Sequence, residues 1–91
     1  MTKLHYNIRV TGKVQGVFYR ASAMSTAMEL GISGFVRNDS DNSVYLEIEG
    51  NPDRLDKFIT WCNKGSDFSK VDHVDFHEGG IQNFKSFEIK R

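Results

Sequence analysis

The sequence predicts an α+β sandwich in which two helices cover one face of a mostly antiparallel sheet. Two segments carry apolar residues at helical spacing, and five shorter segments carry the alternating, β-branched or aromatic residues of strands. These segments follow one another in the order βαββαβ, with a further short strand at the C-terminal end. Because the 91 residues show no break in composition, a single domain over residues 1–91 is expected.

The first strand and the first helix are separated by a loop that contains glycine. Apolar residues alternate with polar ones from Tyr6 to Thr11, as in a strand with one buried face, and this strand is expected to end at Gly12. The first helix is expected to begin near Arg20 and to stop at Gly31. Its apolar stripe is predicted to consist of Ala21, Met24 and Met28, widened by Ala23, Ala27 and Leu30.

A hairpin is predicted to follow the first helix. Residues 32–38 are rich in β-branched and aromatic side chains, and apolar residues alternate with polar ones over residues 44–49. Residues 39–43 between them are typical of turns. Asn42 in this cluster tolerates the left-handed conformation, so the turn is expected to form without glycine.

The second helix has the clearest signals. Asn51 is a favourable N-cap, Pro52 suits the first helical position, and Gly65 follows the last turn. The apolar residues of this helix are spaced i, i+3, i+4 and i+7, and they are Leu55, Phe58, Ile59 and Cys62. Cys62 is the single cysteine, so it is expected to be a buried apolar residue and not a nucleophile.

Residues 73–77 and 87–91 complete the predicted sheet. The resulting order is that of the split βαβ, ferredoxin-like arrangement, in which the first two strands run parallel and the third lies antiparallel between them. Parallel strands place their carboxyl ends at one edge of a sheet. The loop after the first strand, the start of the first helix and Asn38 are therefore expected to meet at one edge.

The loop before the first helix has the features of a phosphate site. Gly12 and Gly16 can adopt positive φ and so direct successive N–H groups into one concavity, next to the positive end of the helix dipole. Arg20 can grip a phosphate through two parallel hydrogen bonds. The backbone N–H groups expected to bind the phosphate are those of Gln15, Gly16, Val17, Phe18 and Tyr19. The side chains of Phe18 and Tyr19 are expected to anchor the loop in the core.

Two sequence runs resemble the motifs of the acylphosphatases. The run from Gly12 to Arg20 is similar to the signature of that family, and the run from Gly34 to Asn38 is similar to its second motif. The resemblance covers nearly the whole chain. It implies hydrolysis of acyl phosphates, the mixed anhydrides of a carboxylic acid and phosphate, with Arg20 and Asn38 as catalytic residues and with no metal or cofactor.

The resemblance also implies the role of each residue. Arg20 would bind the phosphoryl group, Asn38 would orient the attacking water, and a phosphate oxygen of the substrate would take up the proton of that water. The expected partners are a small acyl phosphate, such as acetyl or carbamoyl phosphate, and inorganic phosphate as product and inhibitor. Asp39 directly after Asn38 adds a carboxylate near the expected site.

Charge and hydropathy narrow the range of partners. Twelve basic and twelve acidic residues give a net charge of zero, which argues against nucleic acid as a ligand. Residues 1–28 nevertheless contain four basic residues and no acid, which favours an anionic ligand at the loop. No stretch approaches the roughly 20 apolar residues of a membrane span, and the N-terminus lacks the apolar core of a signal peptide. We expect a cytoplasmic monomer without membrane contact.

Other site types are weighed against this interpretation. An RNA-binding module can share the βαββαβ order, but its third strand would need exposed aromatics, and Tyr45 stands here between acidic residues. A small-anion sensor would have no use for Asn38. His73 and His77 share one strand face, but two histidines without cysteines make a poor metal site. Val14 stands where a Walker loop needs serine or threonine.

Overall fold

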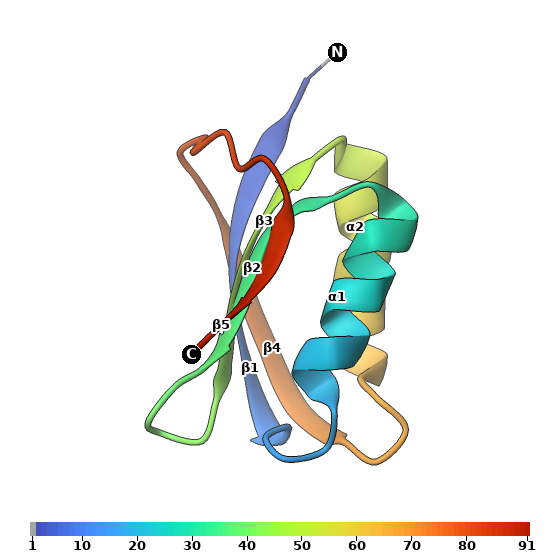
Figure 1. The fold of residues 1–91 in the computed structure, drawn as a ribbon, viewed down its shortest axis with the longest axis vertical. Coiled ribbons are helices and arrows are strands. Elements are labelled where there is room, and N and C mark those ends of the chain that lie inside the picture. Colours follow the sequence, from blue (N-terminus) through green and yellow to red (C-terminus); the bar gives the residue numbers. More distant parts are fainter. Residues whose placement is uncertain (1) are drawn as a thin grey trace.

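The computed structural model describes residues 2–91, which form two helices and a five-stranded sheet (Figure 1). The elements are, in chain order, β1 (Leu4–Lys13), α1 (Tyr19–Leu30), β2 (Ser33–Asn38), β3 (Val44–Gly50), α2 (Pro52–Lys64), β4 (Lys70–Gly79) and β5 (Phe87–Lys90). Both helices lie on the same face of the sheet (Figure 1), which confirms the predicted α+β, ferredoxin-like fold. No helix in residues 2–91 is long and apolar enough to cross a membrane.

The strands lie in the order β4-β1-β3-β2-β5 across the sheet. β3 is antiparallel to both β1 and β2, so these two strands run parallel to each other with β3 between them, as predicted. β5 pairs in parallel with the outer side of β2. The carboxyl ends of β1, β2 and β5 therefore lie at one edge of the sheet, and α1 begins at that edge.

The core fills the space between the sheet and the two helices. The strand register places Val10 opposite Val44 and Ile8 opposite Leu46, and Val36 faces Leu46 from the other side. All five side chains are at most 1% exposed. Because side chains two residues apart on a strand share a face, these positions define the helix-facing side of the three central strands.

β1 and β4 are longer than predicted. β1 continues past Gly12, and β4 spans Lys70–Gly79 where the sequence pattern indicated only residues 73–77. The register shifts between Thr11 and Gly12, as at a bulge. A Cβ at Gly12, which has φ +123°, would lie 2.2 Å from the carbonyl oxygen of Lys70. Gly12 thus permits the close approach of β4. It lies within β1, one residue before the strand ends at Lys13, and its expected part in the phosphate loop stays a prediction.

The buried face of α1 also differs from the prediction. Its buried residues are Tyr19, Ala23 and Ala27, which are spaced four apart. Met28 is 66% exposed and Ala21 is exposed as well, although both were placed in the apolar stripe. Tyr19 supplies the large side chain of the buried face, and the two alanines allow the helix to pack closely. The helix ends at Gly31 in the left-handed conformation, as predicted.

α2 follows its sequence signals. Oδ1 of Asn51 accepts a hydrogen bond of 2.9 Å from the N–H of Asp53, and Pro52 is the first helical residue. Cys62 is fully buried in the apolar stripe of the helix. Burial raises the pKa of the Cys62 thiol to about 12, so the thiol stays protonated at neutral pH. This confirms that Cys62 is a buried apolar residue.

The hairpin turn between β2 and β3 forms without glycine. Asn42 adopts φ +71°, and the N–H of Asp39 donates to the carbonyl of Ser43 over 2.9 Å. The carboxylate of Asp41 accepts a hydrogen bond of 3.1 Å from the N–H of Ser43 and forms an ion pair with Arg9. These contacts confirm the predicted turn and fix the chain directly after β2.

The sheet face away from the helices carries a buried acid that no sequence signal revealed. Glu49 of β3 is 1% exposed, and its Oε2 lies 2.8 Å from Nδ1 of His5. Its carboxylate also accepts hydrogen bonds from the backbone N–H groups of Gln82 and Phe84, the latter over 3.1 Å. Glu49 therefore fastens the segment between β4 and β5 across the sheet.

Candidate active site

A tight loop joins β1 to α1 at the edge where β2 also ends. Gly16 has φ +74° and Phe18 has φ +63°, whereas φ of Val17 between them is negative. When the sign of φ alternates along a loop, successive backbone N–H groups point into one concavity. Apart from its chain neighbours, no atom of residues 2–91 would lie within 4 Å of a Cβ at Gly16. Glycine therefore suits this position because of its φ and not for lack of space.

The N–H groups of this loop are free to bind a ligand. The first hydrogen bond of α1 joins the N–H of Ser22 to the carbonyl of Phe18 over 3.0 Å. Within the part of the chain that the structure describes, none of the N–H groups from Gln15 to Arg20 donates to a protein acceptor. They lie at the positive end of the α1 dipole, where an anion is stabilised.

The side chain of Gln15 ties the loop to the hairpin. Its Nε2 donates to the carbonyls of Asp39 and Ser43, each over 2.8 Å. We expected only the backbone of Gln15 to contribute, because a sequence does not show which carbonyls a loop side chain will meet. The structure gives the Gln15 side chain a positioning role between the loop and the end of β2.

Two hydrogen bonds support the loop from the other side. The hydroxyl of Tyr19 donates to the carbonyl of Cys62 over 2.9 Å, and Oγ of Ser66 donates to the carbonyl of Val17 over 2.7 Å. Tyr19 is 1% exposed, and its ring packs against Trp61 with 4.9 Å between the centroids. The prediction that Tyr19 anchors the loop in the core is confirmed.

The same prediction for Phe18 is wrong. Its side chain is 72% exposed, although the next residue, Tyr19, is buried. Successive side chains at a helix start point in different directions, and Tyr19 takes the direction of the core. Phe18 is the N-cap of α1 and makes no capping hydrogen bond. Phe18 has positive φ, which bulky residues rarely adopt.

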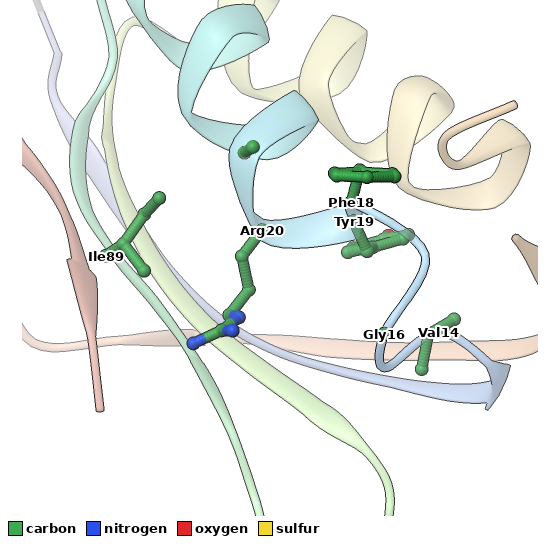
Figure 2. Close-up of a pocket in the computed structure, with 7 residues that line it drawn as sticks. Val14, Gly16, Phe18, Tyr19, Arg20 and Ile89 are labelled. Atoms are coloured by element: carbon green, nitrogen blue, oxygen red, sulfur yellow. The ribbon is translucent and has the colours of Figure 1, made fainter. Parts of the chain in front are cut away.

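Arg20 lies in the first turn of α1 beside an open pocket of about 310 Å³. Figure 2 shows its side chain extending from the helix toward the sheet, between Ile89 of β5 and Gly16 of the loop. No carboxylate of residues 2–91 forms a salt bridge with it, whereas Arg9 and Arg37 are paired with acids. The pocket is lined by Val14, Gly16, Phe18, Tyr19, Arg20, Ala21 and Ile89. A guanidinium without a counter-charge can bind an incoming anion.

Asn38 is the last residue of β2 and lies opposite Val44, on the helix-facing side of the sheet. Its Oδ1 is buried and accepts no hydrogen bond from any residue that the structure describes. Buried polar atoms are nearly always paired, so an unpaired one is unusual and is a candidate partner for a water or a ligand atom. Asn38 does not line the Arg20 pocket. The parallel strands nevertheless bring both residues to one edge, as predicted.

The charge of Asp39 is compensated within the hairpin. Its Oδ1 accepts a hydrogen bond of 2.9 Å from Nε of Arg37, so the carboxylate is not left free beside the phosphate loop. The guanidinium of Arg37 in turn lies 4.5 Å from the ring centroid of Tyr45, whose hydroxyl donates to Glu47 over 2.8 Å. Tyr45 is therefore covered and tied to an acid, which makes it a poor stacking platform for RNA bases.

Comparison with known proteins decides the family. The acylphosphatase family model matches residues 6–89. The chain belongs to the acylphosphatase family. It is 39% identical to an acylphosphatase of Methylococcus capsulatus, covering 100% of this chain and 98% of that one. It is 42% identical to one of Marinobacter nauticus, covering 96% of each. The crystal structure of an acylphosphatase from Bacillus subtilis has a TM-score of 0.94 at 32% identity, covering 97% of this chain and 99% of that one.

This membership confirms the resemblance that the two sequence motifs indicated, and it assigns the chain to the hydrolases. Within this acylphosphatase, β5 contributes a pocket residue that the sequence did not reveal. Ile89 pairs in parallel with Val36 of β2, lines the Arg20 pocket and is 41% exposed. The pairing partner of a four-residue terminal strand cannot be read from periodicity, which explains why this contribution was missed.

The histidines of β4 take part in local contacts. Nε2 of His73 lies 2.9 Å from Oδ1 of Asp75, and Nε2 of His77 lies 3.4 Å from Nδ2 of Asn7. Among residues 2–91 there is no group of three His, Cys, Asp or Glu side chains that could hold a metal ion. The independence of the reaction from metal stays a prediction.

Proposed function

We propose that the chain hydrolyses acyl phosphates to a carboxylate and inorganic phosphate, without a metal ion or cofactor. The observation that carries this proposal is the placement of Arg20. Its guanidinium has no acidic partner in the described chain, and it stands beside a loop whose N–H groups also lack acceptors. Such a set of donors is suited to a phosphoryl group, and family membership indicates that this group belongs to an acyl phosphate.

In this mechanism the phosphoryl group binds to the loop and to Arg20. Two N–H groups of the guanidinium hold two phosphoryl oxygens, and the backbone N–H groups from Gln15 to Tyr19 bind the remaining negative charge. Phosphoryl transfer requires little covalent chemistry from the protein, so positioning and charge stabilisation supply most of the rate enhancement. The hydrogen bonds from Gln15 and Ser66 keep the loop in shape before the substrate arrives.

Asn38 orients the attacking water. Its unpaired Oδ1 can accept a hydrogen bond from that water, and an amide does this without competing for the proton. The water oxygen forms a bond to phosphorus while the bond from phosphorus to the acyl oxygen breaks. The carboxylate leaves with the electron pair of that bond. One proton of the water passes to a phosphate oxygen, and the other stays on the new hydroxyl group.

The chemistry needs residues of one chain only, since the loop between β1 and α1, the first turn of α1 and the end of β2 supply every group that contacts the substrate or the water. A monomer is therefore sufficient and forms part of the proposal, and a cytoplasmic location stays a prediction.

The decisive measurement is the loss of acetyl phosphate or benzoyl phosphate in the presence of excess EDTA. We expect turnover well above the spontaneous rate and competitive inhibition by inorganic phosphate. Turnover that EDTA abolishes would contradict the metal-independent mechanism. Phosphate binding without any acceleration would show that the chain is an anion-binding domain and not an enzyme.

A further inference from the structure

Ser66 contacts the phosphate loop from a distant part of the chain. It lies in the segment between α2 and β4, and its Oγ donates to the carbonyl of Val17 over 2.7 Å. The contact is partly buried, so water competes with it less than it would at an open surface. The proposed mechanism gives the Ser66 hydroxyl no contact with the substrate. Any effect of this residue on the reaction must therefore act through the loop.

The turn that carries Ser66 is itself held firmly. The N–H and Oγ of Ser69 both donate to the carbonyl of Ser66, over 3.0 and 2.7 Å. The N–H of Gly65 donates to the carbonyl of Trp61 over 2.7 Å, which joins the turn to the end of α2. A Cβ at Gly65 would lie 2.2 Å from Oγ of Ser69, so the turn is closely packed. The hydroxyl of Ser66 is thus presented to the loop from a fixed position.

The carbonyl of Val17 belongs to the same peptide unit as the N–H of Phe18. The C=O and N–H of a trans peptide point in opposite directions, and residues 2–91 contain no cis peptide bond. A hydroxyl that holds the Val17 carbonyl therefore directs the N–H of Phe18 away from Ser66. That N–H donates to no acceptor within residues 2–91, and it is one of the donors assigned to the phosphoryl group.

The conformation of Phe18 makes this peptide unit prone to turn over. Phe18 has φ +63°, which a bulky side chain rarely adopts. A flip of the peptide unit between Val17 and Phe18 would return this φ to negative values, and it would turn the N–H out of the concavity. The hydrogen bond from Ser66 would be lost in such a flip. It therefore opposes the local preference of Phe18 and keeps the N–H in the orientation that binds an anion.

We propose that Ser66 is a positioning residue of the active site, whose hydroxyl holds the peptide unit between Val17 and Phe18 so that its N–H points to the phosphoryl group. This inference rests on the proposed function. The N–H contacts the phosphoryl group both in the bound substrate and in the transition state, so its loss weakens the binding of both alike. Ser66 therefore acts on the affinity for phosphate, whereas Asn38 acts on the rate.

The test measures the Kd of inorganic phosphate by isothermal titration calorimetry, together with kcat and KM for acetyl phosphate, in variants whose folding circular dichroism has confirmed. We expect Ser66→Ala to raise Kd and KM by about 5-fold, as for the loss of one hydrogen bond, while kcat stays within about 2-fold. Ser66→Thr keeps a hydroxyl and should restore most of the affinity. An unaltered Kd in folded Ser66→Ala would overturn the inference.

Ser69→Ala is the matched control. It removes a hydroxyl hydrogen bond from the same turn, but this hydroxyl donates to Ser66 and not to the phosphate loop, and the backbone N–H of residue 69 still holds the turn. We expect its Kd for phosphate to equal that of the unaltered protein. Equal weakening by Ser66→Ala and Ser69→Ala would show that only the stability of the turn matters, and it would overturn the positioning role.

A double substitution tests the peptide flip itself. Glycine adopts positive φ about as readily as negative φ, so Phe18→Gly removes the preference for the flipped unit. We expect Ser66→Ala to raise Kd by a smaller factor in the Phe18→Gly protein than in the unaltered one, and the same factor in both would contradict the inference. If the unaltered protein neither binds phosphate nor hydrolyses acetyl phosphate, the proposed function is overturned, and the role of Ser66 with it.

Discussion

Arg20 and Asn38 each carry a polar group that has no partner among the described residues, but the two groups differ in charge. Arg20 presents a positive charge without an acid, which is suited to hold the phosphoryl group in both the ground state and the transition state. Asn38 presents a neutral acceptor, which can act on a water but adds nothing to the binding of a dianion. The two side chains should therefore be separable by kinetics, because uniform binding and transition-state positioning affect different constants.

We predict that substitutions of Arg20 and Asn38 affect the inhibition constant of phosphate and kcat differently. Arg20→Lys loses the two-pronged contact and should weaken inhibition by inorganic phosphate by roughly 10-fold or more while also lowering kcat. Asn38→Ala should leave the inhibition constant of phosphate nearly unchanged and lower kcat by roughly 100-fold, as for the loss of a positioned polar group. Both constants are measured with acetyl phosphate after circular dichroism has confirmed folding.

Arg54 of α2 provides a matched control for Arg20. Its side chain donates to the carbonyl of Leu30 at the end of α1 over 3.2 Å and does not line the pocket, so Arg54→Lys should leave both constants unchanged. Near-normal kcat in Asn38→Ala would show that another group places the water. Unaltered phosphate inhibition in Arg20→Lys would show that charge alone is enough at that position.

At the scale of elements, the loop between β1 and α1 depends on backbone conformation more than on space. Gly16 combines φ +74° with open surroundings, so the cost of a side chain there is conformational. We predict that Gly16→Val weakens inhibition by phosphate about 10-fold or more, whereas Gly16→Asn has a clearly smaller effect because asparagine tolerates positive φ. The inhibition constant of inorganic phosphate measures both. Equal effects of the two substitutions would contradict this account.

The elements themselves could largely be predicted from the sequence because their signals are local. Asn51 and Pro52 mark the start of α2, Gly31 marks the end of α1, and alternation marks β1 and β3. The buried stripe of α1 was misplaced because Tyr19, assigned to the loop, is the first helical residue and defines which side faces the core. Its apolar side chain made Met28 a candidate for the buried face, but close packing of the helix on the sheet places the small residues Ala23 and Ala27 there instead.

Only those features of the candidate site that depend on a local sequence motif or on the strand order could be predicted. The position of the loop, the presence of Arg20 beside it and the edge shared with Asn38 followed from the motifs and the strand order. The partners of Gln15, the outward direction of Phe18 and the arrival of Ile89 depend on contacts between residues far apart in the chain. No periodicity encodes such contacts, which is why these features required the structure.

At the scale of the whole molecule, the two faces of the sheet are covered by different parts of the chain. One face packs against the helices and carries Asn38 at its edge, while the other is closed in part by the segment that Glu49 binds. That segment leads directly into β5, which carries Ile89 to the pocket. The buried acid therefore helps to hold the strand that lines the pocket beside Arg20, although Glu49 itself does not line that pocket.

Glu49 makes the stability of this arrangement depend on pH. Burial alone would raise the pKa of its carboxyl group, but hydrogen bonds from the N–H of Gln82, from His5 and from the N–H of Phe84 outweigh it and hold the pKa below its ordinary value of 4.5. The unfolded chain therefore binds a proton on Glu49 at a higher pH than the folded chain does. The contribution of Glu49 to stability is present above about pH 4.5 and is lost as the pH falls through the lowered pKa of the folded state.

We predict that Glu49→Gln lowers the free energy of unfolding by about 2 kcal/mol at pH 7, because a buried carboxylate that accepts several hydrogen bonds is replaced by a weaker acceptor. The difference from the unaltered protein should shrink as the pH is lowered from about 6 to about 3, where the unaltered protein loses the same contribution. Urea unfolding followed by the fluorescence of Trp61, which is partly buried and packs against Phe58 of the core, measures this difference at each pH.

Glu88→Gln is the control, because it removes an exposed carboxylate of β5 and should change stability little at any pH. A difference for Glu49→Gln that stays constant from pH 6 to pH 3 would mean that the ionised carboxylate is not what fastens the segment, and that the amide substitution acts through packing alone.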